Sequence, residues 1–147
     1  MKNSAPMFGQ CLCGAVKLRV ADSHDPQIGA CHCRMCQRWS GGLFLCFDVA
    51  SDALTVEGPV VCYASSTFAE RAFCSVCGSH LWLRDTNPDN RVHELMPGLF
   101  DAAQVWPLRS EVYSDCAMAA ISLAGDHRRT PQIDYELTNM FVQGDAP

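Results

Sequence analysis

The residues best suited to chemistry in this chain are its cysteines, of which there are ten. Cysteines separated by one or two residues can turn their sulfurs toward one metal ion, and a following glycine can adopt the positive φ that such a turn needs. Four thiolates around Zn²⁺ at ~2.3 Å form the usual structural site of this kind. Seven of the cysteines lie in three such groups: Cys11-Leu-Cys13-Gly14, Cys31-His-Cys33-Arg-Met-Cys36 and Cys74-Ser-Val-Cys77-Gly78. The spacing therefore predicts that these seven cysteines bind metal.

The number of grouped cysteines is also informative, because seven ligands cannot form two sites of four. One site with four thiolates leaves three cysteines for a second site whose fourth position is open. An open fourth position is typical of catalytic zinc, whereas structural zinc is fully enclosed by protein ligands. The spacing alone does not decide which cysteines share a site.

The other three cysteines, Cys46, Cys62 and Cys116, are isolated in sequence, and we expect them to be buried thiols that pack like small hydrophobic residues. A redox dithiol formed by Cys33 and Cys36 is an alternative to metal binding. Such pairs normally lie in a βαβ context, which this sequence lacks. The N-terminal residues show no apolar signal segment, so we expect a reducing, cytoplasmic location without disulfides.

Composition limits the class of protein further. The chain has 147 residues, of which 48% are hydrophobic and 18% are charged, so we expect one folded domain over residues 1–147. Its formal net charge of −5 argues against binding to nucleic acid. No run approaches the ~18 apolar residues of a membrane span, so we expect no membrane partner. The sequence does not indicate an oligomeric state.

The pattern of apolar residues predicts a mainly β domain whose metal ligands lie on turns. Val16, Leu18 and Val20 alternate with charged residues, which predicts a half-buried strand over residues 10–21. We expect one helical turn over residues 33–39 and a short helix over residues 116–124. Further strands are expected over residues 43–49, 54–56, 60–63, 68–73, 80–83, 92–95 and 111–113.

The three cysteine segments, followed by Gly98-Leu-Phe-Asp101, resemble the glutathione-dependent formaldehyde-activating family over about residues 9–107. The resemblance implies an all-β, Mss4-like fold, a tent of small antiparallel sheets with zinc-binding turns. It implies about two zinc ions per chain, a structural one on Cys11, Cys13, Cys74 and Cys77 and a catalytic one on Cys31, Cys33 and Cys36. After Pro107 the chain departs from the family pattern, because Glu111-Val-Tyr113 stands where members commonly have a histidine-isoleucine-aromatic strand.

The resemblance also implies an activity, that of a carbon–sulfur lyase of the S-(hydroxymethyl)glutathione synthase type. A zinc centre of three thiolates suits a soft fourth ligand such as a substrate thiol. We therefore expect reversible addition of a glutathione-like thiol to a small aldehyde. Basic side chains near the ligand segments, Arg34, Arg38 and Arg71, are candidates for binding the carboxylates of the thiol. The alternative is a non-catalytic, zinc-stapled binding module, since one fold can serve unrelated functions.

Overall fold

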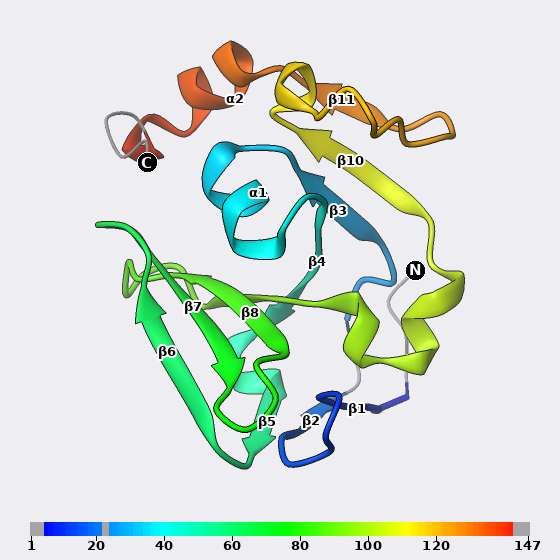
Figure 1. Cartoon of the computed structure of the whole chain (residues 1–147), viewed down its shortest axis with the longest axis vertical. Helices are drawn as coiled ribbons and strands as arrows, with labels where there is room; N and C mark the ends of the chain where they lie inside the picture. The colour runs from blue at the N-terminus through cyan, green and yellow to red at the C-terminus, as the bar shows by residue number, and fades with distance from the viewer. Residues whose placement is uncertain (1–4, 22–23, 143–147) are drawn as a thin grey trace. The chain divides into compact units, whose positions relative to one another are not determined.

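The computed structural model describes residues 5–21 and 24–142, and they form two compact units (Figure 1). The first unit contains the described residues up to Pro26 together with Cys46–Trp106. The second contains Gln27–Leu45 and the chain from Pro107 onward. Each unit is thus built from two separate segments of sequence. The single domain over residues 1–147 stays a prediction.

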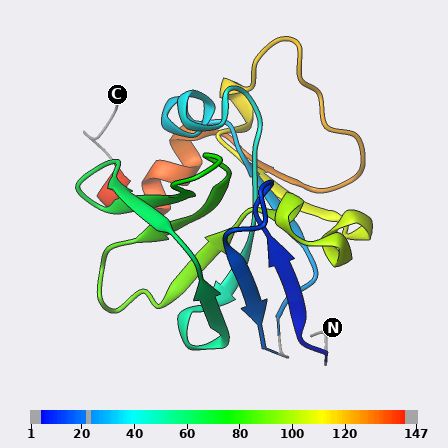
Figure 2. The ribbon, with the colours of Figure 1, turned by 60° about the horizontal axis from the view of Figure 1, so that its bottom comes forward.

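The described residues of the first unit form two antiparallel sheets. In the smaller sheet β1 pairs with β2 and β2 pairs with β5, and Figure 2 shows β1 and β2 side by side in blue. Its strands are β1 (Met7–Gln10), β2 (Lys17–Val20) and β5 (Leu54–Glu57). The larger sheet contains, in spatial order, β4 (Phe44–Ala50, here from Cys46 onward), β9 (Val92–Leu95), β8 (His80–Asp85), β7 (Ala69–Cys74) and β6 (Val60–Ala64).

Alternating burial explains how these strands form the core of the first unit. Leu18 and Val20 of β2 are buried, while Lys17 and Arg19 between them are exposed, as the sequence pattern predicts. Phe47 packs edge-to-face against Phe100, with ring centroids 5.4 Å apart. Cys11 and Cys74 belong to the same buried cluster. The first cysteine pair and the late cysteine pair are therefore anchored in one core.

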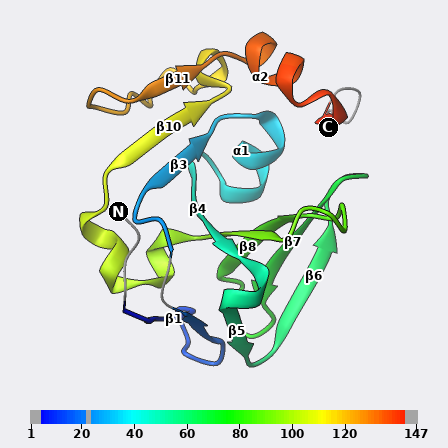
Figure 3. The ribbon, with the colours of Figure 1, turned by 180° about the vertical axis from the view of Figure 1, so that it is seen from behind.

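The described residues of the second unit form a three-stranded sheet with the order β11-β10-β3, which Figure 3 shows from behind. The strands are β3 (Ile28–Cys31), β10 (Leu108–Val112) and β11 (Arg128–Thr130). Both pairings are parallel, which differs from the antiparallel sheets that we expected. Parallel neighbours need long connections. Here the first unit's segment 46–106 separates β3 from β10 in sequence, and residues 113–127 separate β10 from β11.

The two helices are short, and both lie in the second unit. α1 (Arg34–Ser40) confirms the helical turn expected at residues 33–39. The helix expected at residues 116–124 is wrong, because only a 3-10 turn at Ser114–Cys116 forms there. Met118, Ala119 and Ala120 are exposed, and without a buried face a short run of good helix formers does not stay helical. The helix of the last third is instead α2 (Gln132–Thr138).

Strands thus dominate the described part of the chain, and the all-β fold class is confirmed. β9 occupies the residues that were expected for it, 92–95. The segment 101–107 contains the 3-10 turn Asp101–Val105. Neither helix of the described residues is long and apolar enough to span a membrane.

We expect Gly58→Ala to lower the free energy of unfolding by more than ~1 kcal/mol. Gly58 has a φ of 113°, and a Cβ atom there would lie 2.1 Å from the carbonyl oxygen of Ala15. Chemical denaturation followed by circular dichroism measures the loss. Gly98→Ala is the control, because a Cβ atom at Gly98 meets nothing within 4 Å. Equal losses in the two variants would contradict this account of Gly58.

Candidate functional site

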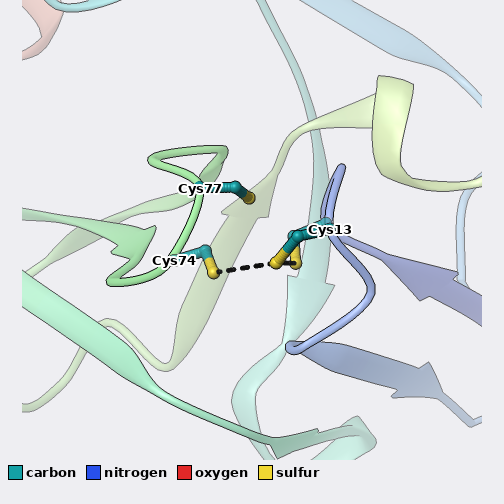
Figure 4. A group of neighbouring side chains, drawn as sticks. Cys13, Cys74 and Cys77 are labelled. Carbon is teal, nitrogen blue, oxygen red and sulfur yellow. Dashed lines mark hydrogen bonds between the residues drawn. The ribbon is translucent and has the colours of Figure 1, made fainter.

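Four cysteine sulfurs of the first unit gather at one point. The Sγ atoms of Cys11, Cys13, Cys74 and Cys77 all lie within 4.8 Å of one another. Cys13 Sγ lies 3.6 Å from Cys11 Sγ and 3.9 Å from Cys74 Sγ, and Figure 4 shows Cys13, Cys74 and Cys77 pointing toward one another. This grouping joins the first and the third cysteine segments of the sequence.

The local backbone explains why these sulfurs converge. After each cysteine pair a glycine adopts a positive φ, 78° at Gly14 and 76° at Gly78, as expected. Gly78 N–H donates to the carbonyl oxygen of Cys74 at 2.8 Å, which closes the turn. Backbone amides also point at sulfur, since Val16 N–H donates to Cys11 Sγ at 3.2 Å. Such amide hydrogen bonds favour the thiolate over the thiol.

The four thiols influence one another strongly. The hydroxyl and the amide of Ser79 lower the pKa of Cys77 to about 5. An amide hydrogen bond from Ala15 favours the thiolate of Cys13, but desolvation and the neighbouring thiols outweigh it and raise the pKa of Cys13 to about 11. Four thiolates this close need a compensating cation. The group is therefore suited to a metal ion.

A second group, in the second unit, contains three sulfurs. The Sγ atoms of Cys31, Cys33 and Cys36 lie within 4.8 Å of one another. Cys33 is the N-cap of α1, and its Sγ accepts a hydrogen bond from the Cys36 N–H at 3.4 Å. Residues three apart in a first helical turn lie side by side, which brings Cys36 next to Cys33.

Strand geometry orients the first member of this group. Cys31 is the last residue of β3, and His32 N–H still donates to the carbonyl oxygen of Val112 on β10 at 3.1 Å. Successive side chains of extended backbone point in opposite directions. The imidazole of His32 points to Glu111, so the side chains of Cys31 and Cys33 both leave the backbone on the other side.

This group is also suited to a cation, and it has three ligands rather than four. Cys33 and Cys36, together with burial, raise the pKa of Cys31 well above its ordinary value. Among the described residues, no fourth histidine, cysteine, aspartate or glutamate ligand atom joins the group within 4.8 Å. The donor set matches the soft thiolate ligands that zinc accepts.

The three basic candidates have different surroundings. Arg34 and Arg38 are exposed on α1, which also carries Cys36, and Arg34 Nη1 donates to Gln37 Oε1 at 2.7 Å. Arg71 is buried on β7 of the first unit, where its Nε donates to Ser65 Oγ at 3.2 Å. Their role in binding carboxylates stays a prediction.

Two polar residues next to the three-sulfur group were not expected from the sequence. Glu111 accepts hydrogen bonds from His32 and His127, which are 79 and 16 residues away in the chain. Gln37 Nε2 donates to the carbonyl oxygens of His32 and Cys116, at 2.7 and 2.9 Å. Short-range spacing could not reveal the contacts of Glu111 with His32 or of Gln37 with Cys116, because each joins residues 79 apart in the chain.

The family model of the glutathione-dependent formaldehyde-activating enzymes matches residues 6–116, and the chain belongs to this family. An uncharacterized lyase of Schizosaccharomyces pombe is 40% identical over 83 residues, which cover 56% of this chain and 60% of that protein. A Halomonas elongata protein named "Putative glutathione-dependent formaldehyde-activating enzyme" is 34% identical over 94 residues, which cover 58% of this chain and 60% of that protein. The chain thus spans 60% of the length of these curated relatives.

A solved structure has a similar fold. The crystal structure of a Rhodobacter sphaeroides protein superimposes with a TM-score of 0.52 and 18% sequence identity. The superposition covers 84% of this chain and 100% of that chain. At this identity the likeness concerns the fold alone.

The isolated cysteines lie outside both sulfur groups, but they are not fully buried as expected. Cys46 and Cys116 are half-buried, and Cys62 is exposed on β6. β6 is the last strand of its sheet, and its residues from Val61 to Ala64 are all exposed.

We expect Cys62 to react slowly with iodoacetamide at pH 8, because only the thiolate reacts. Desolvation and the charge of Glu70 raise the pKa of Cys62 above its ordinary value of 9.0, while Arg84 opposes them. The rate should therefore rise with pH through a midpoint above 9, measured by peptide mass spectrometry. Glu70→Gln should lower the midpoint, and a cysteine peptide with blocked ends serves as the reference. A midpoint at or below that of the reference would contradict the expectation.

Proposed function

We propose that this chain is a zinc-dependent carbon–sulfur lyase that adds a glutathione-like thiol reversibly to a small aldehyde. The observation that carries the proposal is the three-sulfur group of Cys31, Cys33 and Cys36, which leaves one position of a tetrahedral ion for a substrate. Membership of the family supports the choice of glutathione and formaldehyde as substrate classes. The relative named as a lyase supports the reaction class.

The two sulfur groups have different roles in this proposal. Cys11, Cys13, Cys74 and Cys77 hold a structural zinc, since four thiolates enclose the ion. Cys31, Cys33 and Cys36 hold the second zinc, about two ions per chain in total. A zinc ion held by these three thiolates would supply a soft site for a substrate thiol and would favour its thiolate form. The whole chain acts as one zinc-binding domain in a reducing compartment, the cytoplasm.

The reaction is redox-neutral. In the synthetic direction the thiol sulfur forms a bond to the carbonyl carbon, and the π electrons of the C=O bond move to its oxygen. The thiol proton ends on that oxygen, which yields an S-hydroxyalkyl product, and the reverse reaction breaks the carbon–sulfur bond. Arg34 and Arg38 lie on the helix that carries Cys36, where they can pair with carboxylates of the thiol, and Arg71 is the third candidate.

The alternative function, a non-catalytic binding module, differs from the proposed enzyme in the fourth ligand position of the three-sulfur group. It requires a protein side chain to complete the three-sulfur group and enclose the ion. Among the side chains that the structure describes, no further histidine, cysteine or carboxylate lies close enough to do so. This observation favours the enzyme over the non-catalytic binding module.

Metal analysis tests the two sites separately. Protein prepared with zinc under reducing conditions should contain about two zinc ions per chain, given four-thiolate and three-thiolate sites. Cys33→Ser should reduce the content to about one and keep the fold, because serine preserves the N-cap of α1. Cys74→Ser should lose the other ion and destabilise the first unit. Cys62→Ser, outside both groups, should retain both ions.

The activity itself can be followed by NMR with ¹³C-formaldehyde and glutathione. The zinc-loaded protein should accelerate formation of the S-hydroxymethyl adduct over buffer. Cys33→Ser should lower this rate by ~100-fold or more, because it dismantles the open site. Cys62→Ser should match the unsubstituted protein. A fully loaded protein that gives no acceleration would contradict the proposed reaction.

A further inference from the structure

A buried carboxylate lies behind the three-sulfur group. The side chain of Glu111, on the middle strand β10, is 7% exposed. Its Oε2 accepts a hydrogen bond from His32 Nε2 at 2.8 Å, and its Oε1 accepts one from His127 Nε2. The two imidazoles are 1% and 2% exposed. Arg129 Nε lies 3.6 Å from Oε1 at the edge of this cluster.

The hydrogen bonds hold Glu111 as a carboxylate. Burial alone would raise the pKa of Glu111, but the hydrogen bonds and charges of His127 and His32 outweigh burial and lower it. An ionised carboxylate has acceptors only, so each imidazole must carry a proton on the Nε2 that faces it. Removing this acceptor would leave two buried N–H groups without a partner, which is costly.

Strand register explains how Glu111 reaches both imidazoles. Glu111 is paired with Ala30 of β3 and with Arg129 of β11. His32 follows Ala30 by two residues and His127 precedes Arg129 by two, so each lies on the same face as the residue paired with Glu111. Diagonal neighbours of this kind lie within reach of long side chains. The small side chain of Ala30 leaves space for His32 to lean toward the carboxylate.

The backbone orientation that places the His32 imidazole against Glu111 also sets the side from which the neighbouring cysteine side chains project. Cys31 and Cys33 flank His32, and in extended backbone they point away from it. A rotation of the backbone that moved the His32 imidazole away from Glu111 would turn both sulfurs as well, as in a one-residue slip of a strand. We propose that Glu111, held from its other side by His127, is a positioning residue that aims Cys31 and Cys33 at the same point as Cys36.

This inference gives the later part of the chain a role in the site. His127 lies beyond residues 6–116, which the family model matches. The inference rests on the proposed function in one respect, that Cys31, Cys33 and Cys36 are metal ligands. It does not depend on any step of the proposed reaction.

Cobalt(II) titration of Glu111→Gln tests the inference without measuring activity. Cobalt bound by thiolates shows sulfur-to-metal charge-transfer and ligand-field absorption, which reports affinity and geometry. The unsubstituted protein should bind two cobalt ions. In Glu111→Gln one of the two affinities should fall by ~10–100-fold, as is typical for groups that orient metal ligands, with an altered ligand-field band. In a protein that already carries Cys33→Ser and so lacks the second site, Glu111→Gln should leave the affinity and the spectrum of the remaining cobalt ion unchanged.

Further variants separate positioning from general stability. His127→Ala should weaken the same cobalt site, whereas His127→Gln, whose amide can still donate to the carboxylate, should restore much of the affinity. Glu57→Gln, an exposed carboxylate on β5, is the matched control and should bind cobalt normally. Circular dichroism reports whether each variant folds. If Glu111→Gln does not fold, the cobalt affinity and spectrum of His127→Ala test the positioning role instead.

The outcomes distinguish this inference from the proposed function. Folded Glu111→Gln or, failing that, folded His127→Ala with unaltered cobalt affinity and spectrum would overturn the positioning role. An unsubstituted protein that binds one cobalt ion would overturn the proposed second site, and this inference with it. A protein that binds two cobalt ions and loses affinity in Glu111→Gln, yet does not accelerate adduct formation, would contradict the reaction and support the positioning role.

Discussion

Thiols held within 4.8 Å of one another cannot all carry negative charge unless a cation lies between them. Each unit of this chain contains one such group. In the protein alone, hydrogen bonds from the neighbouring thiols together with burial raise the pKa of Cys31, and burial and the neighbouring thiols raise the pKa of Cys13. Metal binding would remove the repulsion and tie together segments that are distant in sequence, so its free energy would contribute to folding. The hydrophobic core, the sheets and the metal ligands would therefore stabilise one another.

The two units gather their sulfurs by different means. In the first unit, two cysteine pairs, one from each of its two sequence segments, meet around a shared core, and each pair is followed by a glycine turn, at Gly14 or Gly78. In the second unit, three ligands come from one short segment, where an extended stretch passes into a helix at Cys33. One short segment has less freedom to surround an ion than two segments that approach from different sides.

The spacing of residues in the sequence was sufficient to predict features that depend on residues close together in the chain. Alternating burial in β2 and the helical turn after Cys33 follow from local periods of two and 3.6 residues. The parallel direction of β3 and β10 could not be predicted, because the whole segment 46–106 lies between them. The same distance in sequence concealed Glu111, whose partner His32 is 79 residues away. The prediction of a helix at residues 116–124 was wrong because helix propensity is a weak predictor where no face of the helix would be buried.

The surroundings of the three-sulfur group extend beyond residues 6–116, the range that the family model matches. All seven grouped cysteines lie within residues 6–116, but several contacts of the second unit come from later residues. Tyr113 adopts a left-handed conformation directly after β10, and its hydroxyl donates to Glu136 of α2 at 3.2 Å. Non-glycine residues in this conformation cost energy and are retained where the surrounding structure requires them. Since function depends on the site rather than on the fold, residues outside the matched range can shape the surroundings of metal ligands that lie inside it.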